Sequence, residues 1–243
     1  MKVYLNRIDG WDDAIISMFL SKRTLTRELE MEIRNEVAAC VNTDPAKGPV
    51  GALVNLTDKL NDWLQKLFKW APIHITMGRF LDFSFTVYGL HRGGQDDIDS
   101  HAKRMENRII RSSTRLANFS DGEMSEYYQG KIIPTDTALA ILGITTPDEI
   151  EHEGQTYVRG VNGYILKGME KNKDAKRGLY MLSIPSDFIF KINFTEYAHL
   201  FKERNEKGTA NPEVKICVER LTDQLGVASY NFINRELLMG VKN

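Results

Sequence analysis

The chain has 243 residues, of which 42% are hydrophobic and 27% charged, which excludes the disordered, collagen-like and disulfide-scaffold classes. Its 32 basic and 33 acidic side chains leave a net charge of -1, so the strongly basic surface of a dedicated nucleic-acid binder is missing. Two cysteines without C-x-x-C spacing disfavour a zinc site or a disulfide framework and suit a reducing compartment, so we expect a cytoplasmic protein without a metal. No stretch approaches about 18 uninterrupted apolar residues, and we expect no contact with a membrane.

The N-terminal third begins with alternating apolar residues, which predict a strand over residues 2–8, ended by a turn at Asp9-Gly10. Apolar residues at helical spacing then predict three helices, with a Pro- and Gly-rich loop over residues 42–51 between the second and the third. The helices are expected from Trp11 to about Leu20, from near Thr24 through Val37, and from Thr57, a good N-cap, to the residues before Pro72.

The central part of the sequence predicts a strand between Phe80 and Leu90, where apolar and polar side chains alternate. After Gly93-Gly94 the spacing changes and predicts one long amphipathic helix over about 20 residues, from Ile98 to Leu116. The other face of this helix would carry a row of guanidinium groups, from Arg104, Arg108, Arg111 and Arg115. Solvent or acidic neighbours can absorb this charge, and so can a bound anion, and the spacing leaves both explanations open.

The C-terminal half predicts no regular element over the turn-rich residues 119–150. Short strands are expected within residues 155–166, interrupted by Gly160 and Gly163, and a core strand ends at Asn193. Two helices complete the chain, one from Phe194 to about Arg204 and one from Pro212, with Asn211 as N-cap, to a stop at Gly226.

Common catalytic signatures are missing from the sequence, which contains no P-loop, G-x-G-x-x-G, G-x-S-x-G or H-E-x-x-H motif. Its five histidines are scattered, and none indicates a metal site. What remains is the arginine row together with Arg177 and Arg204. Because a guanidinium binds phosphate through two hydrogen bonds, this composition favours an anionic small molecule such as a nucleotide.

The segment from Arg177 to Val214 resembles the C-terminal signature of flavin-dependent thymidylate synthases, which runs from an arginine, through an asparagine that closes a strand, to a helix ending in arginine and then A-Q-x-E-I. The residues in register are Arg177, Asn193, His199, Arg204 and the run 210–214, with Asn211 in place of the glutamine. Upstream, His74-Ile75-Thr76 before FLDFSF resembles the family's H-x-T/S and F-x-F pattern. Ser113-Thr114-Arg115 resembles the S-x-R that closes its central motif.

The central motif is where this chain departs from the family. The family's motif begins Arg-His-Arg, whereas this chain has Lys103-Arg104-Met105 and then Arg111 in the approximate positions. About four residues are inserted near Gly93-Gly94. Gln95, beside the insertion, is a candidate for the glutamine with which the family contacts its substrate.

The resemblance implies a single α+β domain over residues 1–243, with a central antiparallel or mixed sheet flanked by long helices, that binds FAD and forms a homotetramer. Arg115 and Arg177 would clamp the phosphate of deoxyuridine monophosphate (dUMP), with Arg111 and Gln95 as further substrate contacts. The catalytic candidates are Arg204, which would bond to the pyrimidine carbonyl, and Ser113, beside the phosphate. The implied flavin contacts are His74, Thr76, Asn193, His199, Ser21 and Arg104. Methylenetetrahydrofolate would supply the carbon and NADPH would reduce the flavin.

Three alternatives stay open beside conversion of dUMP to thymidylate. Because Arg111 stands near the position of an acidic or amide group beside the base, the acceptor could be deoxycytidine monophosphate (dCMP), or the product hydroxymethyl instead of methyl. Loss of Arg-His-Arg is compatible with a relative that binds nucleotides without catalysis. A nucleic-acid binder that uses the row from Arg104 to Arg115 is disfavoured by the neutral overall charge. Asn193 and Asn211 could also act only as helix N-caps.

Overall fold

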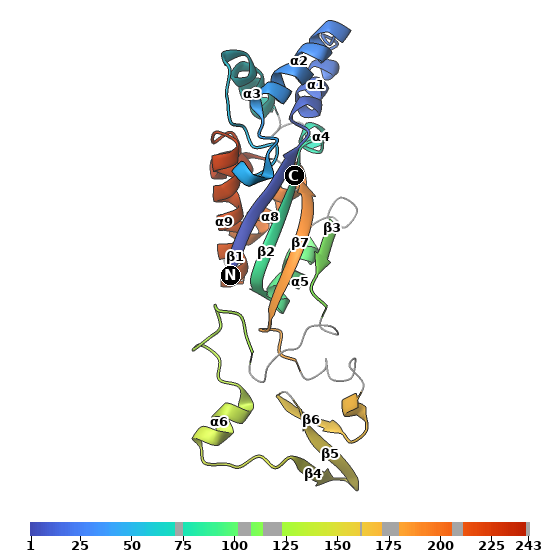
Figure 1. Cartoon of the computed structure of the whole chain (residues 1–243), viewed down its shortest axis with the longest axis vertical. Helices are drawn as coiled ribbons and strands as arrows, with labels where there is room; N and C mark the ends of the chain where they lie inside the picture. Colours follow the sequence, from blue (N-terminus) through green and yellow to red (C-terminus); the bar gives the residue numbers. More distant parts are fainter. Residues whose placement is uncertain are drawn as a thin grey trace. The chain divides into compact units, whose positions relative to one another are not determined.

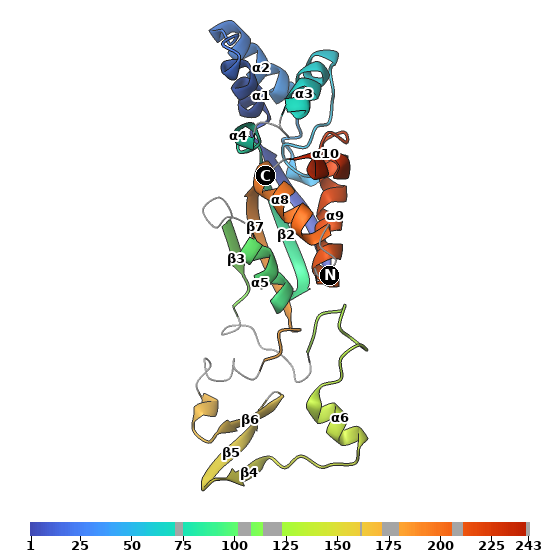
Figure 2. The same cartoon turned by 180° about the vertical axis from the view of Figure 1, so that it is seen from behind.

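The structure is a computed structural model that describes residues 1–70, 75–101, 108–113, 123–160, 162–171, 180–205 and 211–241 (Figure 1, Figure 2). The helices are α1 (Trp11–Ser21), α2 (Arg27–Cys40), α3 (Asp58–Trp70), α4 (Ile75–Gly78), α5 (Arg92–His101), α6 (Thr135–Ile141), α8 (Phe194–Asn205), α9 (Pro212–Ala228) and α10 (Arg235–Gly240), with short 3-10 turns at Pro45–Lys47 and Met169–Lys171. The strands are β1 (Lys2–Asp9), β2 (Asp82–His91), β3 (Arg108–Arg111), β4 (Glu149–His152), β5 (Gln155–Gly160), β6 (Gly163–Leu166) and β7 (Pro185–Asn193).

The strands form two sheets, and the mixture of helices and sheets confirms the predicted α+β class. A four-stranded sheet has the order β1-β2-β7-β3, so strands distant in sequence pair at its centre (Figure 1). A separate three-stranded antiparallel sheet has the order β4-β5-β6. Figure 2 shows α8 and α9 lying along one face of the larger sheet.

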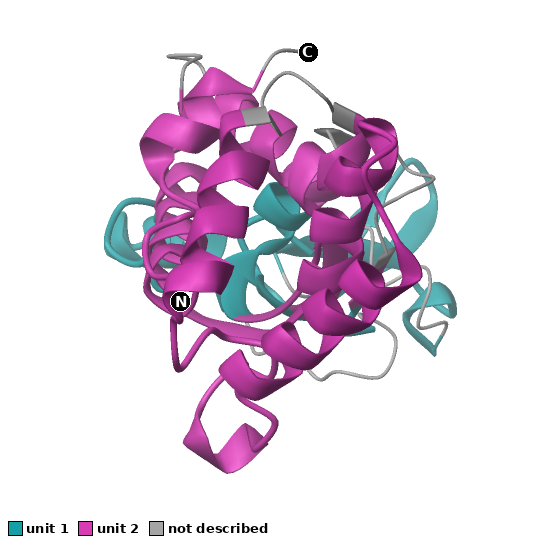
Figure 3. Ribbon diagram, turned by 90° about the horizontal axis from the view of Figure 1, so that it is seen from above, with its two compact units in different colours: residues 1, 88–95, 111–187 teal, residues 2–87, 96–110, 188–243 magenta. Residues whose placement is uncertain are grey.

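The chain divides into two compact units, coloured separately in Figure 3. One consists of residues 1, 88–95 and 111–187, and the other of residues 2–87, 96–110 and 188–243. The smaller sheet and α6 belong to the first unit, and α1 to α4 and α8 to α10 belong to the second. The single domain that the resemblance implies stays a prediction beside this division.

The core of the larger unit is aromatic. Phe83 and Phe85 alternate along β2 and are fully buried, as the period of two predicts. Phe85 stacks on Phe190 of β7, with ring centroids 5.1 Å apart, and on Tyr197 of α8, at 5.7 Å. The same apolar rows that predict β2, β7 and α8 therefore hold the sheet against its helix layer.

Most of the predicted elements are confirmed, and two of their caps rest on the expected residues. Thr57 Oγ1 accepts a hydrogen bond from the Leu60 amide at 3.2 Å at the start of α3. Asn211 Oδ1 accepts from the Glu213 amide at 3.0 Å at the start of α9. The second helix begins at Arg27, a few residues later than expected, because Thr26 supplies its N-cap by accepting from Leu29 N.

The long helix expected from Ile98 to Leu116 is wrong. Helix α5 ends at His101, and residues 108–111 form strand β3, next to β7 in the sheet. Two adjacent isoleucines in this segment favour the extended backbone, and the partner strand β7 supplies the hydrogen bonds that a helix would otherwise make internally. The expected helix face of arginines therefore does not form at Arg108 and Arg111, while Arg104 and Arg115 lie outside the described residues.

Gly226 does not stop α9, which runs on to Ala228. A Cβ atom at Gly226 would lie 3.1 Å from Asn231 Oδ1, and the backbone amides of Ser229 and Asn231 both donate to the Gly226 carbonyl. The glycine therefore provides room for the chain that folds back after the helix.

Four elements, β4, α4, α6 and α10, had no counterpart in the sequence prediction.

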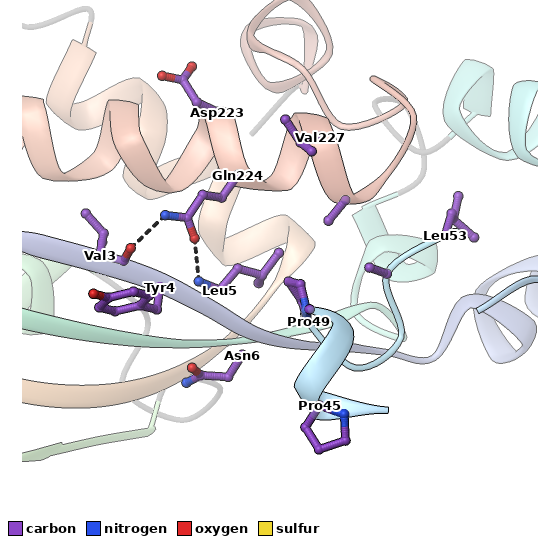
Figure 4. Close-up of a pocket in the computed structure, with 13 residues that line it drawn as sticks. Val3, Tyr4, Leu5, Asn6, Pro45, Pro49, Leu53, Asp223, Gln224 and Val227 are labelled. Carbon is purple, nitrogen blue, oxygen red and sulfur yellow. Dashed lines mark hydrogen bonds between the residues drawn. The ribbon is translucent and has the colours of Figure 1, made fainter. Parts of the chain in front are cut away.

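Strand β1 lies at the edge of the larger sheet, and a side chain of α9 pairs with its backbone. Gln224 Oε1 accepts from Leu5 N at 2.5 Å, and Gln224 Nε2 donates to Val3 O at 2.7 Å (Figure 4). One amide thus satisfies a donor and an acceptor of the edge strand, which would otherwise be open for pairing with another chain.

We predict that Gln224→Met lowers the free energy of unfolding by about 2 kcal/mol, because the methionine leaves both backbone groups of β1 unpaired. Urea unfolding followed by circular dichroism measures the change. Asp223→Asn, on the same turn, is the matched control, because the exposed contact of Asp223 with Arg235 at 3.4 Å contributes at most about 0.5 kcal/mol. Equal stability of the Gln224 variant and the wild type would contradict the role of the amide.

Candidate functional site

The junction of β7 and α8, within the larger unit, carries three of the predicted site residues. Asn193 ends β7, and its Oδ1 accepts a hydrogen bond from the Glu196 amide at 2.9 Å, so it is the N-cap of α8. The Phe194 amide donates to Leu81 O at 2.8 Å, which anchors the first turn of α8 beside the start of β2. Asn193 is buried, and His199, further along the chain on α8, is half-buried. The capping role of Asn193 is confirmed, and its contact with a flavin stays a prediction.

Arg204, in the last turn of α8, is buried, with only 7% of its side-chain surface exposed. Its Nη2 donates to the backbone carbonyl of Asp97 on α5 at 2.6 Å, and its Nη1 lies 3.9 Å from Asp97 Oδ2. A guanidinium group removed from water requires partners of this kind, and hydrogen bonds to it strengthen as the surroundings become less polar. The structure therefore holds the predicted catalytic arginine in a fixed, desolvated position.

The predicted flavin contacts on other elements lie on helices that pack together. Helix α4, which carries the exposed Thr76, packs against both α1 and α8. The approach to α8 is close, since a Cβ atom at Gly78 would lie 2.6 Å from Phe194 Cδ1 and from Thr195 Oγ1. Ser21 is exposed at the end of α1, and its hydroxyl donates to Met18 O at 2.8 Å. These contacts place α4 beside both α1 and α8, and the flavin contacts of Thr76 and Ser21 stay predictions.

A second group of polar residues lies in the smaller unit. Gln95 is wholly buried, and its Oε1 accepts from the hydroxyl of Ser186 on β7 at 2.5 Å. Ser186 Oγ in turn lies 3.4 Å from Ser112 Oγ, which accepts from the Asp187 amide at 3.2 Å. Ser113 follows this pair and is half-buried, whereas Arg111 is exposed. His91, also buried, places its ring edge-on to Tyr128 with centroids 5.0 Å apart.

Sequence reasoning missed the partners of the predicted residues. Asp97, Ser112 and Ser186 hold Arg204 and Gln95, yet none belongs to a motif of its own. The one available signal is that Ser186 occupies an inward position in the alternating pattern of β7. The predicted residues His74, Arg104, Arg115 and Arg177 lie outside the described residues, so their roles stay predictions.

A surface cavity of about 860 Å³ lies elsewhere in the larger unit, between β1, the loop around residues 45–53 and α9 (Figure 4). Its walls are mostly apolar, and none of the residues predicted for the site lines it. Its size suits a small ligand, but the polar amide of Gln224 within it is already bonded to β1. The cavity therefore adds nothing to the predicted site.

The remaining expectations concern metals, membranes and thiols. Among the described residues, no cluster of three or more His, Cys, Asp or Glu side chains is arranged to hold a metal ion. No described helix is long and apolar enough to cross a membrane.

The two cysteines, Cys40 and Cys217, are both buried. Burial raises the pKa of the Cys217 thiol to about 12, and the Glu213 carboxylate acts in the same direction. Neither position offers an activated nucleophile.

Comparison with known proteins was made at the level of sequence and of structure. No protein-family model matches the sequence, and none of the curated proteins matches it either. Among solved structures, thymidylate synthase X (ThyX) from Helicobacter pylori, determined with FAD and dUMP, covers 98% of this chain and 100% of its own, with a TM-score of 0.59 and 13% identity. A second structure of the flavin-dependent enzyme from the same organism, again with FAD and dUMP, covers 96% and 98%, with a TM-score of 0.55 and 14% identity.

A third similar structure broadens the comparison. The UMP/dUMP methylase PolB from Streptomyces cacaoi, bound with 5-Br dUMP, covers 95% of this chain and 92% of its own, with a TM-score of 0.50 and 10% identity. All three alignments extend over nearly the whole chain in both directions. The chain therefore has the fold of flavin-dependent thymidylate synthases, in agreement with the resemblance in sequence.

We predict that the native protein reacts hardly at all with a thiol reagent at about pH 8 over several minutes, because both thiols are buried and the raised pKa of Cys217 keeps it protonated there. After unfolding in guanidinium chloride, both cysteines should react at the rate of free thiols. Absorbance of the released chromophore counts the thiols in each state. A rapid reaction of either thiol in the native protein would show that the core around it opens or that the thiol is activated.

Proposed function

We propose that the protein is an FAD-dependent enzyme that methylates C5 of a pyrimidine deoxynucleotide monophosphate, converting dUMP to thymidylate. The observation that carries the proposal is the ThyX fold, matched over 98% of the chain, together with the register of Asn193, His199 and Arg204 on β7 and α8. The two ThyX structures were determined with FAD and dUMP, which are the ligands we assign to this chain.

The residues that we assign to the flavin suit that cofactor. Thr76 is exposed on α4 and His199 is half-buried on α8, the helix against which α4 packs, so a hydroxyl and an imidazole lie on neighbouring elements. His74, Asn193, Ser21 and Arg104 complete the proposed contacts, the last of them as a cation for the phosphates. The chemistry that a flavin held by these residues would supply is hydride, obtained from NADPH, for the carbon that methylenetetrahydrofolate would deliver.

The protein's own part is to bind and polarise the nucleotide. Arg115 and Arg177 hold the phosphate, with Ser113 and Arg111 as further contacts, so the ring is presented in one orientation. Arg204 donates to a pyrimidine carbonyl and withdraws electron density from the ring. Because its guanidinium is buried and already fixed by the carbonyl of Asp97, it needs little rearrangement as charge develops on that oxygen.

Assembly and location follow the same resemblance. We propose a homotetramer whose sites form between subunits, located in the cytoplasm.

The nucleotide that accepts the carbon and the group that is formed on it are the properties in which this chain is most open to differ from the family. Arg111 stands near the position where the family has an acidic or amide group beside the base, so dCMP as acceptor, or a hydroxymethyl product, is the second candidate.

We predict that the protein, incubated with FAD, NADPH, methylenetetrahydrofolate and dUMP, yields a nucleotide in which a methyl group replaces one hydrogen, a net gain of CH₂ that mass spectrometry will measure. Arg177→Ala should weaken nucleotide binding at least about tenfold and leave FAD binding within about twofold, because the variant removes a charged phosphate contact only. Equal loss of both affinities would make Arg177 a structural residue. A product from dCMP but none from dUMP would favour the second candidate, and binding of both ligands without any product would contradict catalysis.

A further inference from the structure

The buried amide of Gln95 uses only one of its two ends. Its Oε1 accepts from Ser186 at 2.5 Å, whereas Nε2 is enclosed and makes no hydrogen bond within the part of the chain that the structure describes. Native proteins pair nearly all their buried polar atoms, since an unpaired donor destabilises the fold. A fully buried NH₂ group without an acceptor therefore has a hydrogen bond to offer to a bound molecule.

A relay of hydroxyl groups determines which end of the amide is free. The Asp187 amide donates to Ser112 Oγ at 3.2 Å, and Ser112 Oγ lies 3.4 Å from Ser186 Oγ. Since Ser112 accepts at its oxygen, its hydrogen is available for Ser186, whose own hydrogen goes to Gln95 Oε1. The hydroxyl groups of Ser112 and Ser186 therefore each accept one hydrogen bond and donate another.

The relay is attached to the backbone at its far end. The Ser112 amide donates to Asp187 O at 2.8 Å, so Ser112 and Asp187 bond reciprocally where the chain after β3 runs beside β7. Asp187 is itself held, because its Oδ1 accepts from the Gly89 amide at 2.8 Å. The orientation of the Gln95 amide is thus tied to two strands and does not depend on a single contact.

We propose that Ser186 is a positioning residue that binds the oxygen of the Gln95 amide and so leaves its NH₂ group to face C4 of the bound pyrimidine, and thereby selects uracil over cytosine. The two bases differ at C4, where uracil carries an oxygen, which accepts hydrogen bonds, and cytosine an amino group, which donates them. A fixed donor pairs with the first and faces a second donor in the other. The inference rests on the proposed function, within which it names dUMP as the acceptor.

The test compares the affinities of the FAD-loaded full chain for dUMP and dCMP by isothermal titration calorimetry. The wild type should bind dUMP at least about tenfold more tightly than dCMP, because the wrong base leaves a buried donor unpaired. In Ser186→Ala the amide can turn over, and the two affinities should come within about threefold of each other. Ser186→Thr, which keeps the hydroxyl, should restore the wild-type ratio.

Ser183→Ala is the matched control, since Ser183 is also buried, lies just before β7, and its Oγ makes no hydrogen bond within the described chain. It should retain the wild-type ratio of affinities. Ser112→Ala breaks the relay one step earlier at a half-buried position, and an intermediate ratio is expected there even if Ser186→Ala does not fold.

Two results would overturn the inference while leaving the proposed function in place. One is tight dUMP binding with the same ratio in the wild type and in the Ser186 and Ser112 alanine variants. The other is tight dUMP binding by a wild type whose affinities for dUMP and dCMP already lie within about threefold of each other. If the wild type binds FAD but neither nucleotide, the proposed function fails, and the inference fails with it.

Discussion

The hydroxyl group of Tyr197 lies inside the apolar core of the larger unit and is shared between two partners on α9, the Val218 carbonyl at 3.1 Å and Thr222 Oγ1 at 2.8 Å. Its ring stacks on Phe85 and meets Phe83 edge-on at 5.8 Å. Burial raises the pKa of this phenol far above its ordinary value, so it stays neutral and keeps its donor. One side chain of α8 thereby joins the sheet to α9, and the rotation of α8 about its own axis is fixed.

That rotation determines what α8 presents along its length. Arg204 follows Tyr197 by seven residues, which is two helical turns, so it lies on the same buried face. A charged group in that position is costly to desolvate, and the carbonyl of Asp97 compensates for part of the cost. His199 lies off this face and is half-buried. Packing in the core thus accounts for a sequestered guanidinium and a more accessible imidazole on one helix, an arrangement that suits the proposed function.

Local periodicity was sufficient to predict β1, β2, β7 and most helices, because each repeats one apolar face over enough residues to be recognised. It failed from Ile98 to Leu116, where the apolar residues fit a helix but the segment 108–111 pairs with β7 instead. Pairing between strands far apart in sequence leaves no local period to read. For the same reason the residues around Gln95 could not be foreseen, since Ser112 and Ser186 meet only when β3 and β7 are neighbours.

The candidate site shows the same difference between local features and contacts of residues far apart in the sequence. Asn193 and Arg204 could be recognised because a motif spans one strand and the helix that follows it, and the structure gives both a defined local role. Asp97 acts through its backbone carbonyl, which any residue could supply, so no residue type would have indicated it. What the sequence could predict is therefore the candidate residues of one continuous segment, whereas their supporting partners depend on the assembled fold.

The central claim is that this fold still carries a flavin beside a nucleotide, and the visible absorbance of the purified full chain tests it most directly. We expect flavin absorbance to remain with the protein after addition of FAD and gel filtration, and to change in shape when dUMP is added, because the proposed function places the two ligands in one site. A protein that retains no flavin under these conditions, or whose flavin spectrum is unaffected by saturating dUMP, would contradict the account.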